Sequence, residues 1–204
     1  MPADHFRTLA AAAEFRQKIE RSEFLGIAFP VSDDGSFHDE LLRIEKKYFD
    51  ATHHCWAFRL FIDGRQRSSD AGEPAGTAGK PILSAIEAAA LLDVAVVVVR
   101  WFGGVKLGSG GLVRAYRDTA AKTLERATLS DRYICERFTV VVPFDSISVA
   151  YRLVSPPAIT LVEERFEERN EFVFEVRQSQ AEDFTHALTE RRLNFARDVT
   201  PRLR

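Results

Sequence analysis

Apolar and polar positions recur along this chain with two different periods, which predicts an α+β fold. The clearest strand signal is AVVVVRWF, residues 95–102, because a continuous β-branched run is typical of a central strand buried on both faces. Further strands are predicted at residues 24–31, 53–63, 134–144, 158–166, 171–178 and 194–200. Helices are predicted, from apolar side chains every three to four residues, at 37–48, 82–92, 113–127, 147–154 and 184–188.

The ends of these elements are less clearly marked. We expect a helical lead-in that ends at about Ser22, ahead of the first strand. Two residue pairs resemble capping boxes at helix starts, Ser36 with Asp39 and Ser179 with Glu182. Beyond residue 130 the predicted order is β-α-β-β-α-β, which is that of a ferredoxin-like domain. The chain is therefore expected to divide into a domain at 1–130 and a ferredoxin-like domain at 131–204.

Composition narrows the class of protein. The 204 residues are 46% hydrophobic and 28% charged, as in ordinary globular proteins, with a net charge of −2. Any contact with nucleic acid must therefore come from a local basic patch. The apolar run before residue 102 is too short to span a bilayer, and the N-terminus does not resemble a signal peptide. Two widely spaced cysteines indicate reduced thiols and a cytoplasmic protein without a membrane partner.

The first candidate for chemistry is the glycine-rich loop GGVKLGSGG, residues 103–111, between a predicted strand and a predicted helix. It has P-loop glycine spacing, but Ser109-Gly110 replaces the lysine and hydroxyl that such a loop needs. A dinucleotide fingerprint is incomplete too, because Val113 takes the place of its third glycine. Two interpretations stay open, a tight turn with positive φ angles and a site for an anion or backbone phosphate.

The second candidate is the loop SSDAGEPAGTAGKP, residues 68–81, which also leads into a helix. Asp70 and Glu73 are carboxylates three residues apart, with Thr77 and Lys80 nearby. They either hold magnesium beside a phosphate or cap exposed N–H groups.

A third candidate is the triplet His53, His54 and Cys55 within a predicted strand. Alternation turns His54 to the opposite face from the other two, so the three cannot ligate one metal, and no metal site is predicted. Cys55 is either a buried small hydrophobe or the nucleophile of a Cys-His pair.

Three segments together resemble the hallmark motifs of the IMPACT/YigZ family. These are HHCWAFR, SSDAGEPAGTAGKPI and VVVVRWFGGVKLGSGGLVRAY, in that order. One departure is Trp101, where many relatives have tyrosine. The family pattern falls on Asp70, Gly72, Glu73, Pro74, Gly76, Thr77, Gly79, Arg100, Gly103, Gly104, Gly108, Gly110, Gly111 and Arg114.

The resemblance implies an N-terminal domain like domain 2 of ribosomal protein S5, a fold shared with domain IV of elongation factor G. The C-terminal domain would be similar to domains III and V of that factor. Eukaryotic relatives act in translational control, competing for an activator of the kinase that senses uncharged tRNA. For the bacterial members no biochemical activity follows from the resemblance.

The first functional hypothesis is a non-enzymatic protein that contacts RNA or a ribosome-associated partner, without a cofactor. Its expected anion-binding residues are Lys80, Arg100, Gly103, Gly104, Lys106, Gly108, Gly110, Gly111, Arg114 and Arg117. The second loop would add Asp70, Gly72, Glu73, Gly76, Thr77 and Gly79. The alternative is an enzyme that acts on a small phosphorylated substrate with magnesium, although no residue is marked as a nucleophile. The oligomeric state is not indicated.

Overall fold

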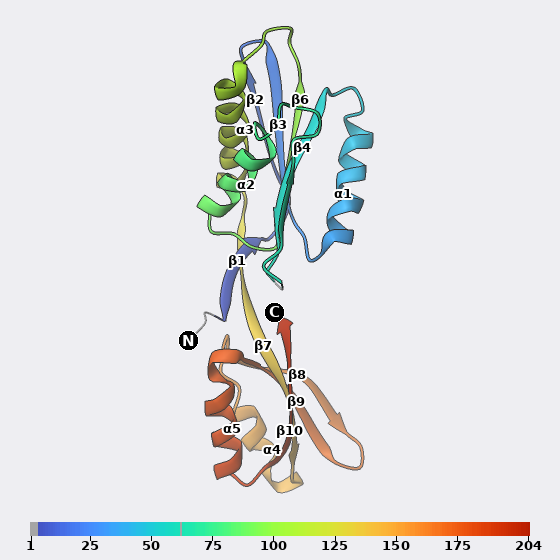
Figure 1. Cartoon of the computed structure of the whole chain (residues 1–204). Coiled ribbons are helices and arrows are strands. Elements are labelled where there is room, and N and C mark those ends of the chain that lie inside the picture. The colour runs from blue at the N-terminus through green and yellow to red at the C-terminus, as the bar shows by residue number, and fades with distance from the viewer. Residues whose placement is uncertain (1–3, 62) are drawn as a thin grey trace. The chain divides into compact units, whose positions relative to one another are not determined.

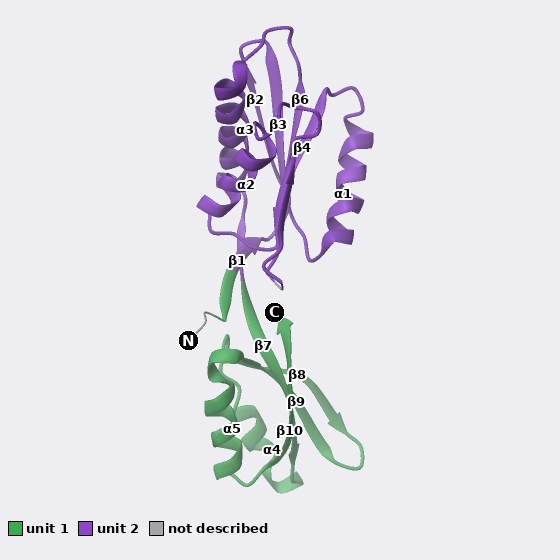
Figure 2. Ribbon diagram, in the orientation of Figure 1, with its two compact units in different colours: residues 1–6, 132–204 green, residues 7–131 purple. Residues whose placement is uncertain are grey.

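The computed structural model describes residues 4–61 and 63–204, which form two compact units (Figure 2). The N-terminal unit comprises residues 7–131. The C-terminal unit comprises residues 132–204 together with Asp4–Phe6. Residues 4–6, which sequence analysis placed in the first domain, therefore belong to the C-terminal unit.

The N-terminal unit is an antiparallel sheet covered by helices on both faces, so the predicted α+β class is confirmed (Figure 1). Its strand order is β2-β3-β6-β4-β5. The strands are β2 (Ala13–Ile19), β3 (Ser22–Pro30), β4 (His53–Arg59), β5 (Gln66–Ser69) and β6 (Val94–Trp101). The helices are α1 (Asp34–Lys47), α2 (Gly79–Ala88) and α3 (Gly108–Glu125). Within the described residues no helix is long and apolar enough to cross a bilayer.

Strand β6 is the centre of this unit, as its β-branched run predicts. It pairs with β3 on one side and with β4 on the other. Val94, Val96 and Val98 pack in the core beneath α2 and α3, whereas the intervening residues of β6 pack in the core beneath α1. The strand is thus buried on both faces, and its end at Trp101 leads directly into the first glycine-rich loop.

The predicted helical lead-in is wrong. The segment forms two strands, β1 (His5–Leu9) and β2. Strand β2 alternates between half-buried and exposed residues and pairs with β3 from Ala13 to Ile19. The helix propensity of the alanines in this segment is overridden because a strand here satisfies the backbone of the sheet edge.

Both predicted capping boxes are also wrong. Helix α1 is capped three residues earlier, where the Asp33 carboxylate accepts a 2.7 Å hydrogen bond from the Ser36 backbone N–H and the Ser36 side chain faces the Asp33 backbone. Asp33 has the extended φ of −161° that a cap position needs. Helix α5 (Ala181–Glu190) begins after a short 3-10 helix at Gln178–Gln180, and the residue at its N-cap position is Gln180, which makes no side-chain cap hydrogen bond.

The C-terminal unit has the element order strand, helix, strand, strand, helix, strand from β7 onward. The sheet order is β1-β7-β9-β8, with β10 also paired to β7. The elements after β7 (Leu129–Val142) are α4 (Ile147–Arg152), β8 (Ile159–Phe166), β9 (Asn170–Arg177), α5 and β10 (Asn194–Leu203). Phe138, Phe174 and Phe184 lie in its buried core, between the sheet and α5.

Asp4 fixes the start of the chain to this unit. Its carboxylate accepts hydrogen bonds from the Arg177 guanidinium at 2.5 Å and from the Ser179 backbone N–H at 2.9 Å. Burial opposes ionisation of Asp4, but the hydrogen bonds outweigh it and lower the pKa of the carboxyl from 3.8 to about 2.

We predict that Asp4→Asn lowers the free energy of unfolding of the C-terminal unit by about 1–3 kcal/mol, because the half-buried Arg177 loses its charged partner. A carboxyl with a lowered folded-state pKa stabilises the protein above pH 4 and stops doing so as pH falls from about 4 to about 2. The wild-type and variant stabilities should therefore converge at low pH. Hydrogen exchange of the β7 and β9 amides, recorded as denaturant is added, measures the free energy of unfolding of the C-terminal unit at each pH.

The matched control is Asp145→Asn, which removes an exposed carboxylate from the same unit. An equal loss of stability in the control, or a difference that persists at pH 2, would contradict the role of Asp4.

Candidate functional site

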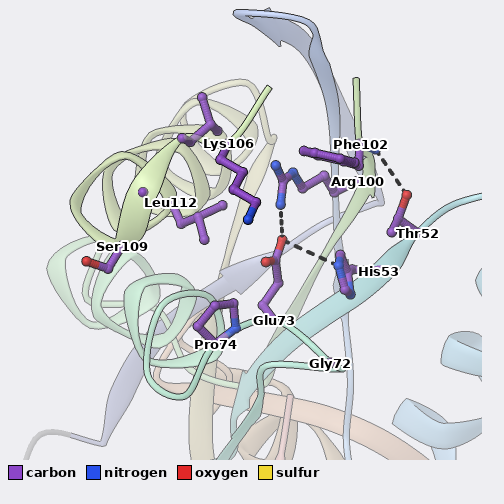
Figure 3. A pocket seen from close by; sticks show the side chains of 12 residues that line it. Thr52, His53, Gly72, Glu73, Pro74, Arg100, Phe102, Lys106, Ser109 and Leu112 are labelled. Carbon is purple, nitrogen blue, oxygen red and sulfur yellow. Dashed lines mark hydrogen bonds and ion pairs between the residues drawn. The ribbon is translucent and has the colours of Figure 1, made fainter. Parts of the chain in front are cut away.

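The two glycine-rich loops meet around one pocket of about 440 Å³ in the N-terminal unit (Figure 3). Gly72 and Glu73 come from the second loop, and Lys106 and Gly108 come from the first. Arg100, at the end of β6, lies between them. The pocket is completed by residues outside the predicted set, namely Thr52, His53, Pro74, Phe102, Leu107, Ser109 and Leu112.

Glu73 and Arg100 form a buried ion pair in the wall of this pocket. Arg100 Nη1 lies 2.5 Å from Glu73 Oε1, and the two side chains are only 5% and 3% exposed. The Tyr116 hydroxyl, from α3, donates a 2.7 Å hydrogen bond to the same oxygen. A buried ion pair is tolerated only where further hydrogen bonds satisfy its polar atoms, and Tyr116 supplies one of them.

Arg100 therefore differs from the exposed anion-binding group that the sequence suggests. Its second terminal nitrogen donates to Ser22 Oγ at 3.1 Å, and its guanidinium lies 5.4 Å from the centres of the Phe24 and Phe102 rings. Since the charge is paired with Glu73, Arg100 shapes the pocket wall and adds little net positive charge to it.

Asp70 caps the second loop rather than facing the pocket. Its Oδ1 accepts hydrogen bonds from the backbone N–H groups of Ala78 and Gly79 at 2.9 and 2.8 Å, and its Oδ2 accepts one from Gly76 at 2.8 Å. Burial alone would raise the pKa of this carboxyl, but the three N–H groups outweigh burial and hold it below its usual value. For Asp70, the geometry favours capping over magnesium binding.

The remaining residues of the second loop maintain its shape. Thr77 Oγ1 donates to the Pro74 carbonyl at 2.7 Å. Gly79 is packed so closely that a Cβ there would lie 2.8 Å from the Ser69 backbone. Lys80 is exposed in the first turn of α2 and does not line the pocket. Among the residues that the structure describes, no group of three or more His, Cys, Asp or Glu side chains is placed to hold a metal ion.

The first loop needs its glycines for backbone reasons at two points at least. A Cβ on Gly103 would lie 1.8 Å from the Arg21 carbonyl oxygen, so only glycine fits between the loop and the β2–β3 turn. Gly108, which opens α3, has a φ of +69°. Gly104 stands between them, and Gly110 and Gly111 belong to the first turn of α3. The tight-turn interpretation is therefore supported, and it leaves an anion site in the same loop possible.

The basic residues near the first loop divide into two groups. Lys106 is exposed, and its ammonium is directed into the pocket in Figure 3. Arg114 lies on the neighbouring surface, where it lines a second hollow of about 520 Å³ together with Lys106 and Gly111. Arg117 lies farther along α3, in a groove shared with α2, and does not line the loop pocket.

His53 is the pocket residue for which sequence analysis missed the correct role. Its Nδ1 lies 2.9 Å from the Ala71 carbonyl, which only accepts, so Nδ1 carries the proton. Its Nε2 lies 3.9 Å from Glu73 Oε1 and forms an ion pair only when the ring is charged. Alternation in HHC correctly turned His54 away, since His54 bonds to the Tyr48 carbonyl on the opposite face.

Cys55 is a structural residue. Its thiol is buried and donates to the Asp70 carbonyl at 3.0 Å. Burial, as the largest effect, raises the pKa of the thiol to about 12, so the thiolate that a nucleophile requires does not form near neutral pH. Of the two interpretations, the geometry favours the buried hydrophobe over the Cys-His nucleophilic pair.

We predict that Glu73→Gln and Arg100→Gln each lower the free energy of unfolding by about 3–5 kcal/mol, because each leaves a buried charge unpaired. The double variant should lose clearly less than the sum of the single losses, since it removes both charges. Trp56 and Trp101 both lie in the N-terminal unit, so denaturant unfolding followed by tryptophan fluorescence reports on this pair.

Glu87→Gln is the matched control, because it changes an exposed glutamate of α2 in the same way. Its stability should stay close to wild type. Additive losses in the double variant would show that the two charges do not depend on each other.

Comparisons with known proteins place this site in a family. The Impact N-terminal domain matches residues 20–124, a range that includes both loops and most of the sheet. IMPACT family member YvyE of Bacillus subtilis is 30% identical over 90% of this chain and 85% of its own length. A Thermus thermophilus IMPACT family member is 43% identical over 67% of this chain and 73% of its own length. A solved structure of a hypothetical protein shares the fold, with a TM-score of 0.66 and 22% identity over 98% of this chain and 97% of that one. The chain therefore belongs to the IMPACT family.

Proposed function

We propose that this chain is a binding protein linked to translation, which contacts RNA or a ribosome-associated partner through its N-terminal unit. The contact surface is formed by the two glycine-rich loops and the first turns of α3. One observation carries the proposal: the loops converge on a single pocket whose rim bears the exposed Lys106. The link to translation comes from the family, because eukaryotic members act in translational control.

Electrostatics supports an anionic partner at this surface. The Glu73–Arg100 pair has no net charge, so Lys106 gives the pocket a net positive charge. Arg114 adds a second exposed positive charge in the adjoining hollow. Helix α3 begins at Gly108 with no side-chain cap, so its first N–H groups remain available to an anion. A phosphate backbone is an anion that fits a row of such groups.

Domain likeness supports the same proposal. We infer that the C-terminal unit is ferredoxin-like, because its elements from β7 to β10 follow the order β-α-β-β-α-β and its strands lie in the order β8-β9-β7-β10. We assign the N-terminal unit to the fold of ribosomal protein S5 domain 2 by family resemblance. Both folds occur in elongation factor G. The free, buried Cys55 and Cys135 fit a reducing cytoplasm, where we expect the protein to act.

Binding of structured RNA tests the proposal. We predict that a labelled RNA hairpin binds to the full chain with a dissociation constant below about 100 μM at low salt, and that affinity falls as salt rises. Lys106→Gln and Arg114→Gln should each weaken binding and reduce the slope of log K against log salt by about 1. Fluorescence anisotropy at several salt concentrations measures both quantities.

The control is Lys46→Gln, which removes an exposed charge of α1, on the face of the sheet opposite α3. Its affinity and salt slope should match those of the wild type. Absence of binding at low salt, or an equal effect of all three variants, would contradict the proposed surface.

The alternative is an enzyme for a small phosphorylated substrate, and one observation favours it. A glutamate carboxylate lies in the wall of a pocket whose volume is within the range of about 300–1,000 Å³ that small-molecule sites have. Against magnesium chemistry through Asp70, both oxygens of that carboxylate are engaged by backbone N–H groups.

Thermal unfolding in the presence of phosphorylated metabolites, with and without magnesium, separates the two functions. If the chain is such an enzyme, one compound should raise the melting temperature in wild type but not in Lys106→Gln. No shift across the panel would contradict the enzyme.

A further inference from the structure

Glu73 has an oxygen that no group of the protein satisfies. Three side chains approach its carboxylate, and all three lie nearest to Oε1. Arg100 and Tyr116 donate hydrogen bonds to this oxygen, and His53 Nε2 lies 3.9 Å from it. In the described part of the chain, no hydrogen bond reaches Oε2. Figure 3 shows the second carboxylate oxygen of Glu73, which carries no dashed line, on the side away from His53. Because Glu73 lines the pocket and its Oε2 is open to it, a bound group with N–H donors would take the place of solvent at this oxygen.

The opposite side of the pocket favours a negatively charged group. Lys106 forms neither an ion pair nor a side-chain hydrogen bond within the described residues. Gly108 and Ser109, at the uncapped start of α3, line the pocket beside it. A ligand must therefore carry a negative charge at this end and N–H donors at the Glu73 end.

Between these two ends the walls are apolar. Phe102 is 45% exposed, and Pro74, Leu107 and Leu112 complete the lining. An exposed aromatic ring in such an apolar wall offers a stacking surface to a flat ligand. The pocket thus suits a planar ring that has donors on one edge and a phosphate attached.

We propose that this pocket binds a guanine nucleotide of single-stranded RNA. Glu73 Oε2 accepts hydrogen bonds from the N1–H and the 2-amino group of the base. The ring lies against Phe102, and the phosphate binds to Lys106 and the first N–H groups of α3. This inference rests on the proposed function and adds the identity of the nucleotide.

Guanine is the base whose edge matches a carboxylate. Its N1–H and 2-amino group are adjacent donors that point to the same side. In adenine and cytosine the amino group is next to a ring nitrogen that accepts, and its lone pair would face the carboxylate. In uracil the single N3–H lies between two carbonyl oxygens. Only guanine thus places two donors at Oε2 without bringing an acceptor close to it.

The test uses the full chain and labelled seven-nucleotide RNAs with one variable base at the centre of a uridine run. Guanine should bind at least about fivefold more tightly than inosine, which differs only by lacking the 2-amino group. Adenine and cytosine should bind more weakly than guanine as well. Fluorescence anisotropy at one low salt concentration provides the four dissociation constants.

Three variants and one control test which residue contacts each part of the nucleotide. Lys106→Gln should weaken all four RNAs by a similar factor, since a phosphate contact carries no base preference, and Lys46→Gln should weaken none. Phe102→Leu should also weaken all four, because it removes the stacking ring. Glu73→Gln should abolish the preference for guanine over inosine. Since Glu73→Gln removes a buried charge, its folding is checked by circular dichroism, and the inosine comparison in wild type stands without it.

The outcomes separate this inference from the proposed function. Equal affinity for the four bases, while the RNA hairpin still binds, overturns the guanine pocket and leaves the RNA-binding surface standing. Loss of binding to hairpin and single strand alike overturns both. Guanosine monophosphate should compete more weakly than the RNA that contains guanine. Equal or tighter binding of the free nucleotide overturns the assignment to RNA and identifies a free guanine nucleotide as the ligand.

Discussion

The site depends on the buried ion pair between Glu73 and Arg100, which links elements far apart in the sequence. Arg100 lies at the end of the central strand β6, and Glu73 lies in the loop before α2. Tyr116 adds α3 through its hydrogen bond to the same carboxylate oxygen. A buried charge costs free energy unless the surrounding elements place its oppositely charged and hydrogen-bonding partners within reach. The ion pair therefore fixes the distance between the two glycine-rich loops, and with it the width of the pocket.

Two carboxylates three residues apart divide the work in the second loop. Asp70 accepts three backbone N–H groups and so holds the loop in one conformation at the start of α2. Glu73 makes its contacts with side chains and is directed into the pocket. Because Asp70 satisfies the backbone, Glu73 does not have to. This explains how a glycine-rich segment can present a buried charge in a defined position.

Periodicity predicted the elements that pack, and missed the elements and contacts that depend on partners distant in sequence. The β-branched run of β6 and the apolar stripe of α1 were recognised because the local spacing of their apolar residues indicates which positions are buried. Strand β2 was misread as helix, since its alternation becomes decisive only once it is paired with β3. The Glu73–Arg100 pair joins residues 27 positions apart, and no local pattern marks it. Gly103 was recognised as a loop residue, but its contact with Arg21 is visible only in the fold.

The turn and the proposed ligand site in the first loop do not exclude each other, because the backbone that the glycines shape also opens the start of α3. Gly103 lets the chain pass against the Arg21 backbone, and the positive φ of Gly108 starts α3 without a side-chain cap. The N-terminus of α2, by contrast, is closed by the Asp70 carboxylate. Two helix N-termini thus lie next to glycine-rich loops, one neutralised by the protein itself and one left open beside Lys106. An anion is expected to bind at the N-terminus of α3 rather than at that of α2, since the positive end of the α3 dipole has no carboxylate of the protein beside it.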